Sequence, residues 1–403
     1  MRISRYLNRM AAGRLLLLCL WSTAVSSVLA GTATNAALTQ YRQQLDQFRK
    51  EFGGSRPMPA VPFFLFGMGN RTKLVYSNGK LREAISGRSL RQWEIADEVI
   101  IPPNYQVELQ LKTGERVSIA EDEKAVWIEE NGRRTLLHGT DTKVVLPSFS
   151  EFKYDQVLRV LHQEILINIL NGKPLPNFLV YSTPWRRDAA MMAMCLRKTD
   201  NLELIRNWVL SLEDPYDHNN KVDGVPENEA DNLGETLYLV SLFSNRRRPI
   251  VRRVLEDISR VYVNDGQRKY IRGRSDFHEA PGYETKWLKF GLRSMGMDDP
   301  YSVPRLRDDY SSLFWWDFKE MDVEDAPRSN DYPYLSWARD HYFGLKRGPI
   351  SNQDYPLTWE SNASQASYEW MAAIDPQFVR HRTAVPHSWH AAEVFLYAYE
   401  LKK

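Results

Sequence analysis

The hydrophobic pattern changes its period twice along this 403-residue chain, and these two changes constrain the fold more than any single motif. From Phe63 to Leu146 apolar residues recur at every second position, which is the period of a half-buried strand. From Glu151 onward they recur at helical spacing. A helical pattern also covers Ala36–Phe52, and prolines separate it from Phe63. The sequence therefore predicts an N-terminal helix, a β region and a long helical region.

The β region is predicted to consist of short strands joined by tight turns. Turns that contain glycine at Ser77–Lys80, Lys112–Glu115 and Glu130–Arg133 separate several of the strands, as in antiparallel hairpins. We expect a small antiparallel sandwich or barrel over residues 57–148, after a helix and linker at residues 31–56. The strands are expected at Phe63–Phe66, Lys73–Tyr76, Glu94–Ile101, Gln106–Leu111, Arg116–Ala120, Ala125–Glu129, Arg134–Leu137 and Lys143–Leu146.

The helical region, residues 149–403, is predicted to hold about ten helices joined alternately by short turns and long loops. Helical hairpins with one class of long connection are typical of a closed toroid or a solenoid. We therefore expect a mainly α fold, an α/α toroid that need not be complete, preceded by the β domain. The helices are expected at Phe152–Leu170, Trp185–Lys198, Leu202–Leu212, Glu229–Phe243, Pro249–Tyr262, Gly282–Ser294, Val303–Trp316, Tyr334–Phe343, Ser361–Ile374 and His387–Leu401.

The N-terminus has the pattern of a secretory signal peptide over residues 1–30. Four arginines precede an uncharged apolar run, and Val28, Leu29 and Ala30 offer a cleavage site. We therefore expect a secreted, extracytoplasmic protein. An uncleaved signal anchor is the alternative, and no other membrane segment is expected.

The net charge argues against a nucleic-acid partner, and the cysteine content argues against an intramolecular disulfide. Removing residues 1–30 takes four of the 53 basic residues and none of the 51 acidic ones, so 49 basic residues face 51 acidic ones and the charge is −2. A nucleic-acid partner would require a concentrated basic face, and none is expected. Cys195 is the only cysteine left, in an apolar helix, so we interpret it as core packing. The oligomeric state does not follow from the sequence.

The stretch Val180–Leu196 combines a helix start, two opposite charges and an apolar helix. Thr183 is predicted to be the N-cap and Pro184 the first helical residue, with Arg187 and Asp188 close behind. The apolar residues that follow predict an inner helix. An ordinary buried ion pair between Arg187 and Asp188 is the alternative to a functional site.

The loops that follow are rich in carboxylates and aromatic rings. Residues 212–229 hold seven acidic or histidine side chains, and later loops carry tyrosines and tryptophans. Pyranose rings pack on flat aromatic faces while their hydroxyls bind charged oxygens, so this composition predicts a sugar site. The expected ligand is an oligo- or polysaccharide.

Three segments resemble one family. Trp185–Ala190 (WRRDAA) resembles the Trp-x-Arg-Asp-Ala/Ser stretch of six-hairpin α/α-toroid glycosidases of the glucoamylase type, and Tyr355–Trp359 (YPLTW) is similar to their Pro-Leu-Thr-Trp segment. Pro386–Glu393 (PHSWHAAE) resembles their closing helix, and the likeness covers residues 181–403. The resemblance implies that Arg187 and Asp188 hold the hydroxyls of the sugar being cleaved. The side chains expected to bind substrate are Trp185, Arg187, Asp188, Trp337, Tyr355, Trp359 and His390.

Glycoside hydrolysis needs a protonated and an ionised carboxyl group. Glu227 and Glu229, which precede a predicted helix, are the candidate acids, and Glu360 is the candidate base. Glu279 and Glu284 remain competitors. We expect a glycoside hydrolase with a two-carboxylate, inverting mechanism. The alternatives are a non-catalytic glycan-binding or cell-envelope protein, and a polysaccharide lyase or sugar isomerase.

No cofactor or metal is expected. His387, His390 and Glu393 lack the spacing of the zinc hydrolases, although all three fall on one predicted helix. Asp217–Gly224 is similar to a calcium loop, but Lys221 occupies a ligand position. A looser calcium site within residues 214–229 remains the alternative.

Overall fold

The computed structural model describes the greater part of the chain. The described residues are 36–51, 57–139, 143–222, 225–226, 228–275, 279–304, 350–358, 360–361, 374–384 and 386–403. The predicted signal peptide and the predicted helices at 303–316, 334–343 and 361–374 lie wholly or largely outside them.

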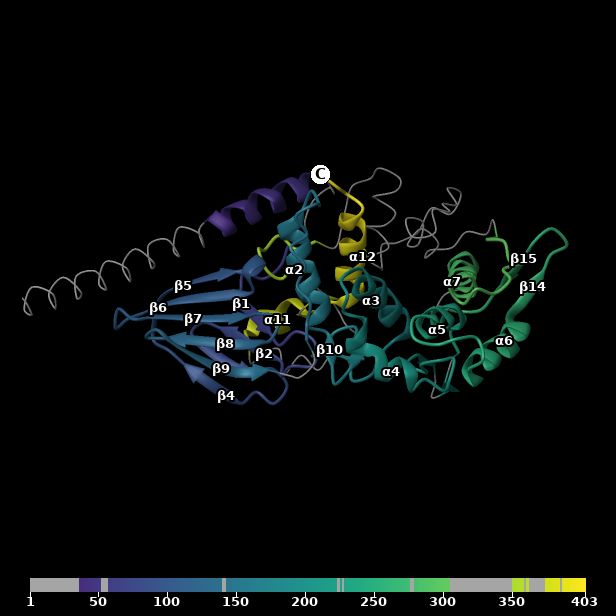
Figure 1. Cartoon of the computed structure of the whole chain (residues 1–403), viewed down its shortest axis with the longest axis horizontal. Coiled ribbons are helices and arrows are strands. Elements are labelled where there is room, and N and C mark those ends of the chain that lie inside the picture. Colours follow the sequence, from purple (N-terminus) through teal and green to yellow (C-terminus); the bar gives the residue numbers. More distant parts are fainter. Residues whose placement is uncertain are drawn as a thin grey trace, which may run out of the picture.

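Five antiparallel strands form the larger sheet, in the order in which they follow one another in the chain. Val107 and Leu109 of one strand lie opposite Ile119 and Val117 of the next, and all four are buried. The predicted alternation is confirmed here, because each strand turns one apolar face to the core. The strands are β5 (Ile95–Ile101), β6 (Gln106–Leu111), β7 (Arg116–Glu121), β8 (Ala125–Glu130) and β9 (Arg133–Gly139) (Figure 1).

Four antiparallel strands form the smaller sheet, again in chain order. The turn between the second and third has Asn78 at φ 47° and Gly79 at φ 71°, the positive values that a two-residue hairpin turn requires. The strands are β1 (Phe63–Phe66), β2 (Leu74–Ser77), β3 (Lys80–Glu83) and β4 (Ser89–Gln92). The sequence missed β3 and β4 because few of their residues are apolar. The strand predicted at residues 143–146 is wrong, since that stretch has no regular secondary structure.

The helices follow the predicted order with shorter bounds. A helix covers residues 36–51. The others are α2 (Asp155–Leu166), α3 (Arg186–Lys198), the 3-10 turn η2 (Leu202–Ile205), α4 (Arg206–Leu210), α5 (Asp231–Ser241), α6 (Pro249–Val261), α7 (Pro281–Ser294), α11 (Pro376–His381) and α12 (Ser388–Tyr399). Between them lie the paired strands β10 (Ile169–Leu170) and β11 (Lys173–Pro174), β12 (Lys221–Val222) and β13 (Val225–Pro226), β14 (Tyr262–Asn264) and β15 (Lys269–Ile271), and β16 (Glu360–Ser361) and β17 (Thr383–Ala384).

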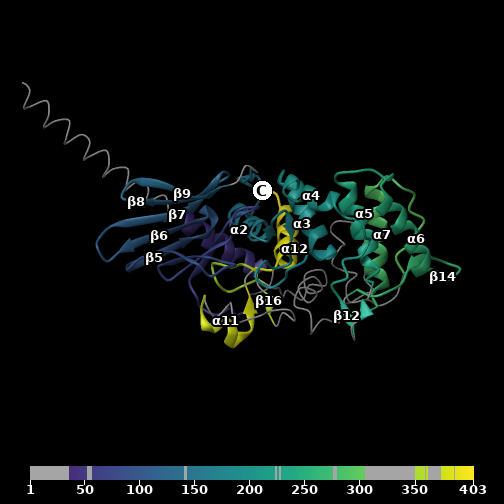
Figure 2. The same cartoon turned by 90° about the horizontal axis from the view of Figure 1, so that it is seen from below.

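The described helices pack in a row that leads away from the sheets. α12 packs against both α2 and α3, α3 packs against α5, and α5 packs against α6 and α7. Figures 1 and 2 show this row from two directions, with the sheets at one end and α6 at the other. A Cβ atom on Gly234 of α5 would lie 2.2 Å from the carbonyl carbon of Trp287 on α7. Only glycine allows these two helices to approach so closely.

The prediction of a mainly α, α/α-toroid fold is wrong. The chain has a mixed architecture, with a four-stranded and a five-stranded antiparallel sheet beside the helices. Within the described part of the chain, the helices form a row with α12 inserted between α2 and α3, instead of a ring of consecutive hairpins. Helical periodicity identifies which face of a helix is buried, but it does not say which helix covers that face. The hydrophobic pattern therefore could not predict which helices pack against one another.

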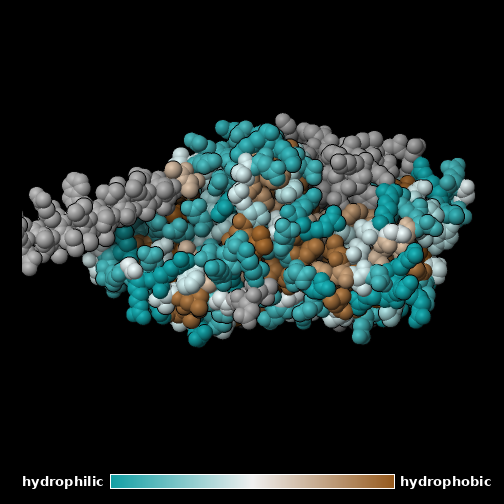
Figure 3. All heavy atoms as spheres, viewed as in Figure 1, coloured by the Kyte–Doolittle hydropathy of each residue, from teal (hydrophilic) through white to brown (hydrophobic). Residues whose placement is uncertain are grey.

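One apolar core connects the sheets to the helices. Phe63 of β1 contacts Phe378 of α11 with ring centroids 5.2 Å apart, and Phe149 contacts Phe395 of α12 at 5.7 Å. Hydrophilic residues cover most of the face shown in Figure 3, and hydrophobic ones gather in patches near its middle. None of the helices in the described ranges is both long enough and apolar enough to cross a membrane.

Candidate functional site

Arg187 lies at the centre of a buried group of charges at the starts of α3 and α5. It is the second residue of α3, and its side chain is 4% exposed. Its Nη1 donates to Oε1 of Glu229 at 3.1 Å and to Oδ2 of Asp231 at 2.9 Å. Neighbouring residues of a helix point in different directions, so Arg187 and Asp188 meet different partners. The ion pair joins two helices, whereas the sequence suggested a pair between adjacent residues.

Two indole rings flank the guanidinium of Arg187. Its Cζ lies 5.5 Å from the ring centroid of Trp185 and 5.6 Å from that of Trp389 on α12. Both distances are within the range of a cation–π contact. Trp185 was predicted to belong to the site, whereas Trp389 was not assigned a role.

Asp188 lies beside the start of α12. Its Oδ1 lies 3.7 Å from Nδ1 of His387, which is too far for a hydrogen bond. Burial, then His390 and Arg187, hold the pKa of His387 well below its usual value, so its imidazole is uncharged. The rings of His387 and His390 lie 4.8 Å apart. The structure thus brings the predicted Asp188 and His390 to the same end of α12.

Glu235 of α5 adds a third carboxyl group to the cluster. Its side chain is fully buried, and Oε2 accepts a hydrogen bond from Asn232 Nδ2 at 3.3 Å. Burial, and after it the charge of Asp231, raise the pKa of Glu235 well above its usual value. Glu229 and Asp231 face a guanidinium, which stabilises their charged forms. The cluster therefore combines two carboxyl groups that pair with an arginine and one whose pKa is raised.

The loop before α5 ties the two helix starts together. Asp217 Oδ2 accepts from the backbone N–H of Arg186 at 2.7 Å, and the N–H of Asp217 donates to Asn232 Oδ1 at 3.1 Å. The predicted N-cap is wrong, because α3 begins two residues later and Thr183 instead bonds Asn219 Oδ1 at 2.7 Å. A carboxylate from a distant loop caps α3, which local sequence cannot reveal.

Tyr355 lies apart from the Arg187 cluster. Its ring packs on Phe63 and Phe64 of β1, with centroids 5.5 and 4.5 Å away. The following residues are held by Glu164 of α2, which accepts hydrogen bonds from Leu357 N and from both the N–H and the hydroxyl of Thr358. The structure thus places this segment at the junction of β1 and α2, where Tyr355 fills core space.

Glu360 is described only in its backbone. It lies in β16 opposite Ala384 of β17, three residues before His387. Three residues span at most about 11 Å, so the strand partner of Glu360 lies within about 11 Å of His387. Glu227, Trp337 and Trp359 lie outside the described residues.

The two other candidate acids, Glu279 and Glu284, each form contacts that hold the structure together. Glu279 is exposed and accepts from Arg272 Nε at 2.9 Å. Glu284 is buried, and its Oε2 accepts from the backbone N–H of Gly273 at 2.8 Å. Cys195 is buried in α3 and bonds Ala392 O of α12 through its sulfur at 3.7 Å.

Sequence reasoning missed Asp231, Glu235 and His387. A signal for the first two was present, since Asp231 and Glu235 are four residues apart in an otherwise apolar helix and must share its buried face. Among the described residues, no group of three His, Cys, Asp or Glu side chains is arranged to hold a metal ion. Asp223 and Gly224 of the proposed calcium loop lie outside those residues.

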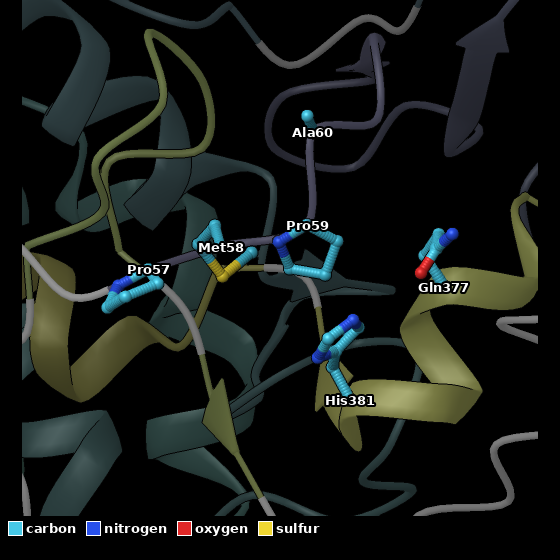
Figure 4. A pocket seen from close by; sticks show the side chains of 6 residues that line it. All are labelled: Pro57, Met58, Pro59, Ala60, Gln377 and His381. Atoms are coloured by element: carbon cyan, nitrogen blue, oxygen red, sulfur yellow. The ribbon is translucent and has the colours of Figure 1, made fainter.

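Two hollows lie away from the Arg187 cluster. One of about 320 Å³ is lined by Pro57–Ala60 and by Gln377 and His381 of α11, and Figure 4 shows the imidazole of His381 directed toward Pro59. Another, of about 620 Å³, lies between the N-terminal helix, β1 and the segment before Tyr355. No residue of the cluster lines either hollow, so neither serves its chemistry.

The likeness to six-hairpin glycosidases was carried by three short segments. The structure brings residues of the first and third, Trp185–Asp188 and His387–His390, side by side, and places the second against β1 and α2. No family model matches this chain, and neither a curated protein nor a solved structure matches it.

Proposed function

We propose that this protein hydrolyses glycosidic bonds in an oligo- or polysaccharide at the Arg187 cluster. The observation that carries the proposal is the pairing of aromatic rings with carboxyl groups in two protonation states. Trp185 and Trp389 flank the arginine, while Glu229 and Asp231 share its charge. Sugars bind to such surfaces because their C–H faces pack on rings and their hydroxyls bond charged oxygens.

The environments of the carboxyl groups suggest their roles. An acid catalyst must be protonated at working pH, and the raised pKa of Glu235 meets that requirement. Glu229, predicted from sequence as the acid, instead faces Arg187, so we now propose it as the ionised group. Glu235 would donate the proton to the leaving oxygen, and Glu229 would activate water.

The spacing of the charged pair bears on stereochemistry. Oxygens of Glu229 and Asp231 each lie about 3 Å from the same Arg187 nitrogen, so the two are at most about 6 Å apart. An inverting enzyme needs about 6.5–9.5 Å between its acid and base. Glu229 and Asp231 therefore cannot together be the acid and base of an inverting enzyme. The proposed acid, Glu235, lies outside this pair, and Glu360 remains the alternative base for inversion.

The test is reducing-sugar release from a panel of polysaccharides by the wild type and by Glu229→Gln, Glu235→Gln and Glu360→Gln. We expect loss of about 10²–10⁴-fold for the true acid and base. Glu279→Gln is the matched control, because Glu279 forms an exposed ion pair. Glycan binding without hydrolysis by any variant or the wild type would favour the non-catalytic alternative and refute the proposal.

The uncharged His387 favours one second candidate, a polysaccharide lyase. A neutral imidazole beside Asp188 is a suitable proton acceptor for β-elimination. A lyase acting on uronates also needs an unshared positive charge for the sugar carboxylate, and Arg187 already faces two carboxylates. A product that absorbs in the ultraviolet, abolished by His387→Gln and retained by Glu235→Gln, would establish the lyase and exclude the hydrolase.

We also propose that the protein is exported, as the pattern of residues 1–30 indicates. An extracytoplasmic site would meet polysaccharides of the surroundings or of the cell envelope. Mass measurement of the exported protein tests this, since cleavage after residue 30 would leave a mature chain that starts at Gly31. A full-length chain in the membrane fraction would instead indicate a signal anchor.

A further inference from the structure

A hollow of about 430 Å³ lies beside α4, outside the Arg187 cluster. Parts of the chain that are far apart in sequence line it, and polar side chains surround one indole. The residues that matter here are Asn70, Asn171, Lys173, Glu203, Asn207 and Trp208. Its volume falls in the range of small-ligand sites.

The rim of this hollow is fixed by hydrogen bonding and by turn geometry. Asn70 Oδ1 accepts from the backbone N–H of Gly172 at 2.6 Å, which ties the turn after β1 to the β10–β11 hairpin. Asn171 and Gly172 adopt positive φ angles of 51° and 73°, as a two-residue hairpin turn requires. A rim fixed in this way is already ordered before a ligand binds. Less conformational entropy is then lost on binding, which favours affinity.

The polar groups around the hollow suit an uncharged ligand rich in hydroxyls. In the described residues, the side-chain amides of Asn171 and Asn207 have no hydrogen-bond partner in the protein and are exposed. Glu203 is already paired with Arg206 at 3.1 Å, so Lys173 is the main remaining charge. One lysine at the rim does not provide the arginine fork or the clustered charge expected for a phosphate or uronate.

Trp208 supplies the flat apolar surface that a sugar ring needs. It is partly exposed, and the guanidinium of Arg186 lies 5.6 Å from its ring centroid. Arg186 is in turn bonded to Thr236 of α5 at 3.2 Å and to Asp214 O at 3.0 Å. The tryptophan is therefore held by the residue that precedes Arg187, which places this hollow next to the first turn of α3.

We propose that this hollow, the Trp208 subsite, binds an uncharged pyranose unit of a polysaccharide without cleaving it. The inference rests on the proposed function for its ligand class, because both sites would hold parts of one extended chain. The hollow presents an indole for the pyranose face and amides for the hydroxyls. No carboxyl pair with the surroundings of Glu229 and Glu235 lines it, so its role is binding.

The test measures binding and not turnover. Affinity electrophoresis in gels that contain amylopectin, arabinoxylan or galactomannan gives Kd for the full-length protein carrying Glu235→Gln. We expect Trp208→Ala to raise Kd for the preferred polysaccharide at least about tenfold, and Asn207→Ala to raise it by about threefold through the loss of one hydrogen bond. Trp208→Phe keeps a ring under Arg186 and should give a smaller increase. Gln267→Ala, at an exposed position of the β14–β15 turn, is the matched control.

The outcomes separate this inference from the proposed function. Unchanged Kd in both Trp208→Ala and Asn207→Ala overturns the Trp208 subsite even if the wild type hydrolyses the polysaccharide. Failure of the parent protein to bind any of the three neutral polysaccharides also overturns it. Loss of binding in these variants supports the Trp208 subsite. If the wild type nevertheless shows no hydrolysis, the hydrolase proposal is refuted while the subsite stands. Circular dichroism identifies any variant that does not fold, and Asn207→Ala keeps the test decisive because that exposed side chain makes no hydrogen bond or ion pair within the described part of the protein.

Discussion

The β region and the helical region each bury an arginine, but in different surroundings. Arg71 Nη1 bonds Glu121 Oε1 at 2.7 Å with both side chains at 0% exposure. The oxygens of Glu121 also accept from the backbone N–H groups of Gly67 and Met68 at 2.8 and 2.7 Å, which fixes the turn after β1. Arg187 instead meets two carboxylates from another helix, between two indole rings. The comparison indicates that burial of a charge does not identify a site.

The two arginines differ in the role of their carboxylate partners. In the β region a single carboxylate binds both the arginine and two backbone N–H groups, so the group holds a turn. In the helical region three carboxyl groups lie near Arg187, and burial raises the pKa of one of them, Glu235. Excess acid in an apolar environment is the condition under which neighbouring groups separate their pKa values, as acid–base catalysis requires.

The largest effect is expected for Arg187→Met. Removing the cation leaves Glu229 and Asp231 buried without it, so the free energy of unfolding should fall by about 3–5 kcal/mol. Hydrolysis should also fall at least about 10²-fold, because the ionised group would then take up a proton. Denaturant unfolding and reducing-sugar assays measure the two. If folded Arg187→Met protein still hydrolysed polysaccharide, Arg187 would have only a structural role, as Arg71 has.

Arg71→Met should be comparably destabilising but catalytically silent. We expect a loss of about 3 kcal/mol in unfolding free energy, since Glu121 stays buried. The double variant Arg71→Met/Glu121→Gln should recover part of that loss, because the buried carboxylate that has lost its arginine is also removed. Specific activity per folded molecule, determined after correction for the unfolded fraction, should match the wild type. A tenfold fall in specific activity would contradict this prediction, because it would show that Arg71 in the β region affects catalysis in the helical region.

The helical region should lose stability as the pH rises. Burial raises the pKa of Glu164 on α2 from 4.5 to about 8, so the folded protein binds a proton that the unfolded chain has released. Its contribution is complete below about pH 4.5 and disappears as the pH rises through about 8. Thermal unfolding from pH 5 to 8 should show a midpoint that falls more steeply in the wild type than in Glu164→Gln. Equal slopes in both proteins would show that Glu164 does not titrate in this range.

The β region should show the smallest effect, and with the opposite sign. Burial lowers the pKa of Lys73 from 10.5 to about 7, although Glu121 opposes the shift. Between about pH 7 and 10.5 the unfolded chain binds the additional proton, so stability rises with pH. Lys73→Met should flatten this slope. The amine also donates to the carbonyls of Gly67 and Gly69, so a lower overall stability is expected at every pH.

Local patterns predicted elements well and their arrangement poorly. The alternation in Gln106–Leu111 located β6 without error, and the apolar run after Asp188 identified α3 as buried on most sides. The ring of helices failed because helical period carries no information about which helix neighbours which. The site was predictable in part. Arg187, Asp188 and Glu229 stood at recognisable helix starts, whereas Trp389 joins them only through the insertion of α12 between α2 and α3.

The position of α12 also affects how the chain can fold. Its neighbours α2 and α3 are separated from it by about 200 residues, and Cys195 of α3 bonds Ala392 across that interval. Contacts so distant in sequence form slowly, because a long loop must close before they stabilise anything. During synthesis the centre of the core must wait until α12 has left the ribosome.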